Sequence, residues 1–271
     1  MSAPFTDSQA TTLTYNSAEY IVECLDSLLN QTLDSFEIII SDNCSTDNTV
    51  ELVRNKKIKN LKIYQNSKNM GIAKNFNIVC NLAEGKYIKL LPSDDKITKD
   101  SLEKSVKYFE KHQDISLVVS SKKIINQSSK IILKNVSSFS EGIHVGKDVI
   151  WKILNSGRNP LGEPTVAMFK KDNFIEVGGF NENYKLTLDI DLWVRLLEKG
   201  NLYFIEKPLG YFRIHSKSQS LERNIYKNYL EWLHDLQDKF GISRQRRIFI
   251  IMKIRFFNIA KQLFYFFLRI K

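Results

Sequence analysis

Two neighbouring carboxylates offer the clearest chemistry in this sequence. Asp94 and Asp95 follow the apolar segment Tyr87–Leu91, which Pro92 and Ser93 bring to an end. In α/β proteins, ligands gather at the carboxyl ends of the strands, and carboxylate oxygens suit a divalent cation such as Mg²⁺ or Mn²⁺. The pair therefore predicts a metal that carries a phosphorylated substrate. An acidic turn that caps the next helix is the plain structural alternative.

The residues around this pair alternate between strand and helix patterns, from Tyr15 to about Val119. The expected strands are Phe36–Ile40, Leu61–Tyr64, Tyr87–Leu91 and Ile115–Val119. The expected helices begin at a Ser17 cap, at Thr46 or Asp47, after the turn Asn69-Met70-Gly71, and near Asp100. This order predicts an α/β fold with a mostly parallel, Rossmann-like sheet and helices on both faces.

The chain carries an excess of positive charge. Lys and Arg number 40 against 30 Asp and Glu, a formal net charge of +10 that favours nucleotides, nucleic acid or acidic lipid head groups as partners. At 271 residues and 43% apolar composition, the chain can bury a sizeable core. Cys24, Cys44 and Cys80 are too few and too scattered for a disulfide framework, and they lack metal-ligand spacing. A reducing cytosol is therefore expected. The first residues are polar and have neither the basic start nor the apolar stretch of a signal peptide, so no signal peptide is expected.

Short motifs occur along the chain in a recognisable order and spacing. In the first half they are Thr14-Tyr15-Asn16, Ser41–Asp47, Asn69-Met70-Gly71 and Leu91–Asp95. In the second half they are Gly162–Thr165, Val177–Phe180, Asp189–Trp193 and Tyr211–His215. Together, over roughly residues 11 to 220, they resemble the family 2 glycosyltransferases of the GT-A fold. The resemblance implies this fold and a role in building bacterial surface glycans.

The resemblance implies that a nucleoside-diphosphate sugar binds at the strand ends of the first half. Tyr15 would stack on the nucleotide base, and Asp42 would accept a hydrogen bond from a base N–H. The implied donor-binding residues are Thr14, Tyr15, Asn16, Asp42, Asn43, Asn69, Gly71, Lys74, Ser93, Asp94 and Arg213. The structural alternatives are that Tyr15 belongs to the core and that Asp42 only forms a turn.

The implied cofactor is Mg²⁺ or Mn²⁺, which would bridge the diphosphate of the donor. Its implied ligands are Asp94, Asp95 and His215, with Arg213 beside the diphosphate. A surface histidine without a ligand role is the alternative for His215. The family motif often begins with a further carboxylate where this chain has Pro92. With fewer ligands, either metal binding is weaker or Asp94 carries most of it.

The implied catalytic residues are Asp189, as general base, and Asp191 in support. A single displacement of a nucleoside diphosphate from the anomeric carbon inverts that carbon, and a positioned carboxylate that accepts the attacking hydroxyl's proton contributes about 10²–10⁴-fold. A helix-capping role is the alternative for Asp189. Leu188 stands where the family commonly has an acidic residue. The implied acceptor contacts are Glu163, Pro164 and Trp193.

Two regions are expected. Residues 1–220 form the GT-A domain, with a nucleotide-sugar half (1–120) and an acceptor and catalytic half (121–220), and residues 221–271 form a helical, basic extension. Lys122–Ile125 and Lys130–Leu133 predict a hairpin, and Lys147–Leu154 predicts a short helix. Gln9–Leu13 is polar and weakly strand-forming, so an irregular first strand is expected.

The C-terminal region has a basic amphipathic pattern. Its apolar residues step by three and four from Phe249 through Met252, Phe256, Ile259 and Leu263 to Phe267. The cations Arg246, Arg247, Lys253, Lys261, Arg269 and Lys271 fall outside that stripe and are too frequent for a membrane-spanning helix. The pattern predicts a helix in a membrane interface, with packing on its own domain or on a second subunit as the alternative. A cytoplasmic enzyme, peripheral on the inner face of the cell membrane, would fit it.

Other classes explain part of the pattern. A nucleic-acid binder would account for the charge but not for acidic turns at successive strand ends, which repel phosphate without a metal. A nucleotidyltransferase would show a Gly-rich basic loop where this chain has Tyr15–Glu19. A degenerate glycosyltransferase that binds without turnover is the third alternative. The expected function is metal-assisted, inverting sugar transfer to a glycan or lipid-linked acceptor in bacterial polysaccharide, lipopolysaccharide or glycan assembly.

Overall fold

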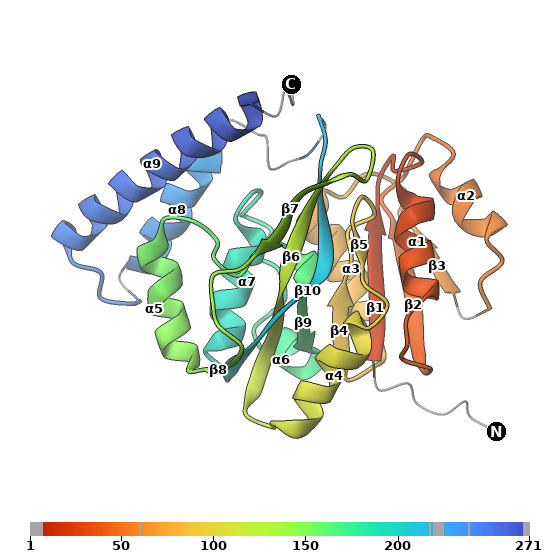
Figure 1. The fold of residues 1–271 in the computed structure, drawn as a ribbon, viewed down its shortest axis with the longest axis horizontal. Coiled ribbons are helices and arrows are strands. Elements are labelled where there is room, and N and C mark those ends of the chain that lie inside the picture. The colour runs from red at the N-terminus through yellow and green to blue at the C-terminus, as the bar shows by residue number, and fades with distance from the viewer. Residues whose placement is uncertain (1–7, 60, 217, 219–224, 238, 268–271) are drawn as a thin grey trace.

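A mixed β-sheet lies between two layers of helices (Figure 1). The computed structural model describes residues 8–59, 61–216, 218, 225–237 and 239–267. The strands are β1 Ser8–Thr14, β2 Phe36–Asp42, β3 Leu61–Gln65, β4 Tyr87–Leu90, β5 Lys96–Ile97, β6 Ile115–Asn126, β7 Ile131–Val136, β8 Gly142–His144, β9 Ala167–Lys170 and β10 Asn201–Ile214. The helices are α1 Ile21–Leu29, α2 Thr49–Asn55, α3 Ile72–Leu82, α4 Ser101–Lys111, α5 Gly146–Ser156, the 3₁₀ turn Pro164–Val166, α6 Lys171–Glu176, α7 Leu188–Leu197, α8 Ile225–Gln237 and α9 Arg244–Phe267.

The sheet is parallel in one half and mixed in the other. Its order is β3-β2-β1-β4-β9-β6-β10-β5, with β7 on β6 and β8 on β10. Strands β3, β2, β1 and β4 are parallel, whereas β9 runs antiparallel to both β4 and β6. The predicted α/β fold with a central sheet is confirmed. Parallel pairing holds among β3, β2, β1 and β4 and between β6 and β10, and β9 lies antiparallel between these two groups.

The first strand is regular, contrary to the expectation from its polar sequence. Strand β1 lies inside the sheet, where Thr11 pairs with Ile39 on one side and with Leu90 on the other. Ala10, Thr11 and Thr12 are buried. Threonine is β-branched and suits a strand despite its hydroxyl, and the Thr11 hydroxyl donates to the Lys89 carbonyl oxygen at 3.3 Å.

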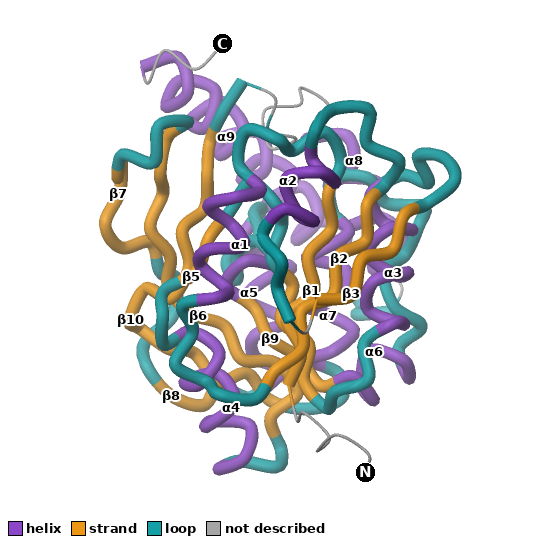
Figure 2. Tube along the Cα trace, turned by 90° about the vertical axis from the view of Figure 1, so that its right-hand side faces the viewer, coloured by secondary structure: helices purple, strands orange, loops and turns teal. Residues whose placement is uncertain are grey.

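Helices cover both faces of the sheet, as predicted. Figure 2 shows α1 and α4 on one side of the strands and α3 and α6 on the other. The side chains of β2 alternate accordingly: Ile39 belongs to the hydrophobic cluster that includes residues of α3, α5 and α7, whereas Ile38 and Ile40 belong to the cluster that includes residues of α1 and α4. The burial of both faces explains why the inner strands read as apolar runs.

Two helix starts differ from the prediction. Helix α1 begins at Ile21, after Tyr20 and without a side-chain cap, so Ser17 is not its cap. The Ser17 hydroxyl instead lies 2.7 Å from the Ser93 hydroxyl. Helix α2 begins at Thr49, because the Thr46 amide and hydroxyl both donate to the Asn16 side-chain oxygen and so belong to the preceding turn.

The later elements follow the predicted order. Strands β6 and β7 form the expected hairpin, and α5 contains the predicted short helix. Helices α8 and α9 pack on the same core as the catalytic half, through Trp232 and Leu233 from α8 and Ile250 and Ile254 from α9. Within the described residues, no helix is both long enough and apolar enough to cross a bilayer.

Candidate active site

A cavity of about 1180 Å³ lies at the carboxyl ends of the parallel strands. The loops after β1, β2, β3 and β4 line it with Tyr15, Asn16, Asn43, Asp47, Asn69, Gly71, Ser93, Asp94 and Asp95. The second half of the chain adds Arg158, Asn159, Glu163, Pro164, Lys185, Asp189, Arg213 and His215. Helices α8 and α9 add Tyr229, Ile254, Phe257 and Asn258. Most of the predicted site residues therefore meet in one cavity.

Asp94 and His215 form a close pair on the wall of this cavity. The His215 Nε2 atom lies 3.0 Å from the Asp94 Oδ2 atom. Asp94 comes from the turn after β4, and His215 follows the last residue of β10. The ring of Tyr20 lies against His215, with centroids 5.0 Å apart. A carboxylate oxygen suits Mg²⁺ or Mn²⁺, whereas an imidazole nitrogen suits softer metals. Asp94 is therefore the stronger ligand of the pair for Mg²⁺ or Mn²⁺.

Asp95 does not face the cavity as a free carboxylate. Its side chain is buried, its Oδ1 atom accepts the Arg213 amide at 2.7 Å, and its Oδ2 atom accepts the Thr165 hydroxyl. Burial, together with the charge of Asp94, holds the pKa of Asp95 well above its usual range. The predicted metal-ligand role of Asp95 is thus replaced by a structural one: it ties β10 and the turn at Pro164 to the turn after β4.

The remaining donor set fits a cation that arrives with a diphosphate. Among the residues that the structure describes, no three His, Cys, Asp or Glu side chains converge as an all-protein metal site. Mg²⁺ is commonly held by one or two carboxylates, with substrate phosphates and water completing its shell. Asp94 with His215 satisfies that requirement and leaves room in the cavity for phosphate oxygens.

Arg213 is buried, and each nitrogen of its guanidinium donates to a protein group, so its contact with the diphosphate stays a prediction. Its Nε atom donates to the Asp94 carbonyl oxygen at 2.6 Å, and its Nη1 atom donates to Ser129 Oγ at 2.9 Å in the β6–β7 turn. Its Nη2 atom donates to Glu23 at 3.0 Å. Although partial burial opposes it, hydrogen bonds from Lys96, Ser129 and Arg213 lower the pKa of Glu23 to about 2. Arg213 therefore braces the backbone that presents Asp94.

Arg213→Met should destabilise the protein. Removing the guanidinium leaves the Asp94 carbonyl oxygen without its donor, whereas Glu23 keeps hydrogen bonds from Lys96 and Ser129. We expect the free energy of unfolding to fall by about 1–3 kcal/mol, the cost of an unsatisfied buried polar group. Urea denaturation measures this change. Arg54→Met, on the exposed surface of α2, is the control and should stay within about 0.5 kcal/mol. Unchanged stability combined with weak donor binding would support the predicted phosphate contact.

The residues predicted to hold the nucleotide divide into two groups. Asn43, Asn69 and Gly71 line the cavity and are interlocked: the Asn69 side-chain oxygen accepts Asn43 Nδ2 and the Gly71 amide, both at 2.9 Å. Gly71 has φ +82°, a conformation that favours glycine, and leads directly into α3. Tyr15 also lines the cavity and is 47% exposed, so its ring is available for stacking.

Thr14, Asp42 and Lys74 do not line the cavity. Thr14 is buried at the end of β1, and Lys74 is exposed on α3. Asp42 is buried, and its two oxygens accept the amide and the hydroxyl of Ser45 at 3.0 and 2.5 Å. The predicted contact between Asp42 and the base is therefore not what the structure presents. Asp42 shapes the turn from which its neighbour Asn43 reaches the cavity.

Asp189 lies in the first turn of α7 and lines the cavity. Its Oδ1 atom accepts the Ile190 amide at 2.8 Å, and its Oδ2 atom accepts Asn159 Nδ2 at 2.9 Å. Withdrawal from bulk water raises its pKa to about 6, and the nearby charge of Glu163 adds to the rise against these two donors. A carboxylate that titrates near neutral pH suits a general base.

The raised pKa of Asp189 makes a prediction for stability. Because its pKa rises from 3.8 to about 6 on folding, the ionised carboxylate lowers stability as the pH climbs from about 4 to 6. Asp189→Asn should therefore be more stable than the wild type at pH 8, by about 3 kcal/mol, and equal to it below about pH 4. Thermal unfolding across pH measures this. A variant less stable at pH 8 would indicate a structural helix cap.

Asn159 is a site residue that the sequence did not reveal. Its Nδ2 atom donates to Asp189 and to the Gly162 carbonyl oxygen, both at 2.9 Å. Its Oδ1 atom accepts the amides of Leu161 and Gly162 at 3.0 and 3.1 Å. The Gly157–Gly162 sequence signals a turn, but only the fold shows that this turn places an amide against the candidate base.

The C-terminal helices also belong to the site, which the sequence did not predict. The Tyr229 hydroxyl on α8 donates to the Arg158 carbonyl oxygen at 3.0 Å. On α9, Ile254 packs on Gly157, where a Cβ would come within 2.9 Å of the Ile254 amide nitrogen. Glycine at this position, with φ +70°, lets α9 approach the loop that carries Asn159.

Of the other predicted catalytic and acceptor residues, two are buried away from the cavity and two line it. Asp191 is buried, pairs with Arg195 at 2.5 Å, and accepts Trp232 Nε1 at 3.3 Å, so it fastens α7 to α8 instead of acting in the cavity. Trp193 is fully buried and donates its Nε1–H to Gly162, so it supports the loop and does not contact an acceptor. Glu163 and Pro164 line the cavity as predicted, and Glu163 pairs with Lys122.

Comparison with known proteins now identifies the family. A profile described as Glycosyl transferase family 2 matches residues 11–174, more than half of the chain. The chain belongs to this family. Its mixed α/β fold is that of the GT-A members. The matched segment ends before α7, so Asp189, α8 and α9 lie outside it.

Individual relatives agree with this assignment. The chain is 28% identical over 239 residues to chondroitin synthase of Escherichia coli, covering 86% of this chain and 33% of the relative. It is 30% identical over 214 residues to hyaluronan synthase of Pasteurella multocida, covering 77% of this chain and 20% of the relative. The chain thus spans a third or less of these two relatives.

The fold is shared with a protein of known structure. The crystal structure of S. aureus TarS residues 1–349 in complex with UDP-GlcNAc superposes with a TM-score of 0.71 at 21% sequence identity. The match covers 92% of this chain and 71% of the TarS chain. The similarity therefore extends beyond the family profile into the C-terminal part of the chain.

Proposed function

We propose that this protein transfers a sugar from a nucleoside-diphosphate sugar to a hydroxyl group of a glycan or lipid-linked acceptor, with metal assistance and with inversion at the anomeric carbon. The observation that carries the proposal is the meeting of Asp94, His215 and Asp189 on one cavity, although they come from distant parts of the chain. The pair Asp94–His215 provides the leaving-group side of the reaction, and Asp189 provides the base.

The donor proposed is a UDP-sugar. TarS, whose crystal structures include complexes with UDP and with UDP-GlcNAc, has a similar fold over most of this chain. In this chain, the exposed ring of Tyr15 offers a stacking surface for a base, and the amides of Asn43 and Asn69 line the same wall. Side-chain amides and an aromatic face recognise a pyrimidine through hydrogen bonds and stacking without requiring a charge.

The proposed mechanism assigns separate tasks to the two acidic positions. A divalent cation bound with the donor by Asp94 and His215 would offset the charge that develops on the departing diphosphate. Asp189 takes the proton of the acceptor hydroxyl, while Asn159 and the Ile190 amide hold its carboxylate in a fixed orientation. Arg213 and Asp95 keep the turn carrying Asp94 against β10.

The biological setting proposed is bacterial polysaccharide, lipopolysaccharide or glycan assembly, on the cytoplasmic face of the cell membrane. Similarity to bacterial chondroitin and hyaluronan synthases supports a glycan product. The basic, Phe-rich α9 supports peripheral contact with the membrane, where a lipid-linked acceptor would lie.

Turnover of a panel of nucleotide sugars tests the proposal. Release of nucleoside diphosphate is measured for UDP-, dTDP- and GDP-linked sugars, with Mn²⁺ and with EDTA. We expect release from a UDP-sugar in Mn²⁺ and none in EDTA. Binding of a donor without release in the presence of acceptor-bearing membranes would indicate the degenerate transferase, and release unaffected by EDTA would contradict metal assistance.

A further inference from the structure

Helix α9 is apolar on two opposite faces, and only one of them is covered by the protein. The inner face carries Ile250 and Ile254, which are 0% and 3% exposed and join the main core. On the same side, Phe257 and Asn258 line the active-site cavity. This inner face is not the stripe that the sequence pattern singled out. Helix α9 does pack on its own domain, but through Ile250 and Ile254 and not through the stripe that begins at Phe249.

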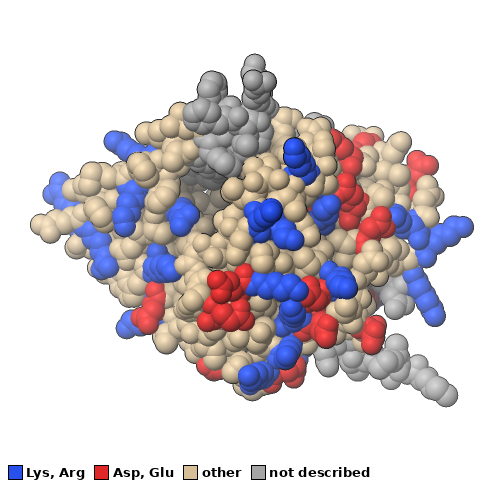
Figure 3. Space-filling view, in the orientation of Figure 1, with Lys and Arg blue, Asp and Glu red and all other residues tan. Residues whose placement is uncertain are grey.

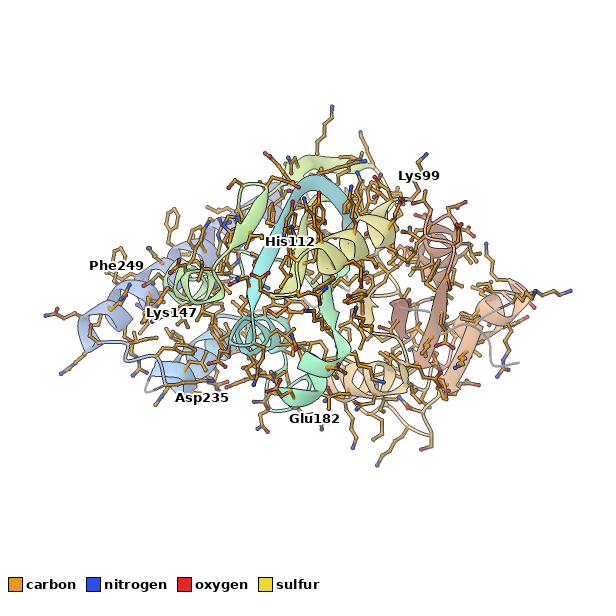
Figure 4. The ribbon with its side chains drawn as sticks, turned by 90° about the horizontal axis from the view of Figure 1, so that it is seen from below. Lys99, His112, Lys147, Glu182, Asp235 and Phe249 are labelled. Carbon is orange, nitrogen blue, oxygen red and sulfur yellow. The ribbon has the colours of Figure 1, made fainter. Side chains whose placement is uncertain are left out.

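The outer face consists of Phe249, Met252, Phe256, Ile259 and Leu263, called here the outer stripe. These side chains are 53%, 55%, 67%, 59% and 52% exposed, respectively. At about 100° per residue, they fall within a sector of about 80°, centred opposite Ile254. Figure 4 shows Phe249 on the outer side of α9, away from the body of the molecule. Contiguous apolar exposure of this kind marks an interaction surface.

The charges on α9 favour one partner for this surface. Its ionisable residues are Arg244, Arg246, Arg247, Lys253, Arg255 and Lys261, with no Asp or Glu. By the same helical geometry, Arg244 and Arg255 border one edge of the outer stripe and Arg246 and Lys253 border the other. In Figure 3, basic side chains predominate at the end of the molecule where α9 lies.

A second copy of this chain is disfavoured as the partner, because joining two such helices would bring cations against cations. An anionic lipid surface instead offers hydrocarbon for the stripe and negative charge for its borders. Lys253 illustrates the arrangement: its ammonium lies 4.6 Å from the Phe249 ring centroid and donates to the Asn155 carbonyl oxygen at 3.1 Å. Long cationic side chains at the edge of an apolar stripe can reach head groups while the stripe stays in the acyl region.

We propose that the outer stripe of α9 inserts into the surface of an anionic membrane while the inner face of the same helix closes the catalytic cavity. An interfacial helix lies in the plane of the membrane, with its apolar face buried by about 5–10 Å. A helix is about 10 Å across. The cavity wall at Phe257 would then lie within about one helix diameter of the lipid. The second half of the inference rests on the proposed function: the cavity receives the sugar of a lipid-linked acceptor whose chain stays in the bilayer.

Vesicle flotation with the full chain tests the docking. The vesicles contain phosphatidylcholine alone or with 30% phosphatidylglycerol, and the test variant is Met252→Asp with Phe256→Asp. The matched control is Leu29→Asp with Ile175→Asp, which adds the same charge at residues 47% and 55% exposed on α1 and α6. We expect the wild type and the control to float with anionic vesicles. The fraction of the test variant that floats should be at least tenfold smaller.

Several outcomes would overturn the proposal. They are equal flotation of the test variant and the wild type, equal loss in the control, and a wild-type dimer in sedimentation that only the test variant dissociates. Circular dichroism and Tm establish that both variants are folded. UDP-sugar binding is measured in parallel without vesicles, because a variant that binds the donor but fails to float shows a docking effect separate from the proposed transferase activity.

Discussion

Asp189→Asn is expected to lower kcat about 10²–10⁴-fold while leaving donor affinity unchanged. The amide keeps the shape of the carboxylate but cannot accept the proton of the acceptor hydroxyl. Asp189 lies in the cavity with one oxygen held by Asn159 and the other by the Ile190 amide, so its loss removes the positioned base and little else. Steady-state rates of nucleoside diphosphate release, with donor binding by calorimetry, measure the two quantities.

The control for this variant is Asp172→Asn. Asp172 is also a carboxylate in the first turn of a helix, α6, but it is exposed and does not line the cavity. If Asp189 only completed a helix terminus, both variants would change activity by a similar small factor. A kcat that falls only in Asp189→Asn, in a variant that is at least as stable as the wild type at pH 8, isolates the chemical role.

Asp94→Asn is expected to remove most of the metal stimulation and to lower kcat/KM about 10²-fold or more. Loss of the carboxylate leaves His215 as the protein ligand of the pair, and a cation bound to diphosphate needs at least one protein carboxylate to be held at the site. The Mn²⁺ concentration that gives half-maximal activity should rise at least tenfold. Titration of nucleoside diphosphate release with Mn²⁺ at saturating donor measures it.

Asp34→Asn is the matched control, because Asp34 is an exposed carboxylate on the loop between α1 and β2. It should leave the Mn²⁺ response unchanged. A wild-type Mn²⁺ response in Asp94→Asn would show that the cation is held elsewhere.

The positions of the loops that bear the site could be predicted from the sequence, because they depend on strand order. Apolar runs followed by polar turns placed Asn43, Asn69 and Asp94 at the ends of parallel strands, and the structure brings them to one cavity. The helix pattern after Thr187 likewise placed Asp189 at a helix start. These signals are local, since one strand and the turn after it decide them.

The roles of the polar side chains could not be predicted in the same way. Asp95 and Arg213 have the residue types of a ligand and a phosphate contact, but each finds protein partners more than 60 residues away along the chain. A buried polar group must satisfy its hydrogen bonds, and which partner is available depends on the tertiary fold. The neighbours Asp94 and Asp95 therefore differ in role because Asp94 pairs with His215, whereas both oxygens of Asp95 accept hydrogen bonds from buried protein groups.

The C-terminal region shows the same limit for apolar residues. Periodicity correctly identified the stripe from Phe249 to Leu263 but could not tell whether the protein covers it. Ile250, Ile254 and Phe257 form a second stripe on the opposite side of the helix. Ile250 and Ile254 of this stripe pack in the core, and Phe257 lines the cavity. A helix that is apolar on two faces is ambiguous by pattern alone, and contact with Gly157 and the cavity decides its orientation.

Calorimetry of UDP-sugar binding to three proteins tests the central claim most directly. The claim is that Asp94 and Asp189 act in one cavity, the first in binding the donor and the second in the chemical step. We expect the wild type and Asp189→Asn to bind the donor with equal affinity in Mn²⁺ and not in EDTA, and Asp94→Asn to bind it at least tenfold more weakly. Equal, metal-independent binding by all three proteins would contradict the account.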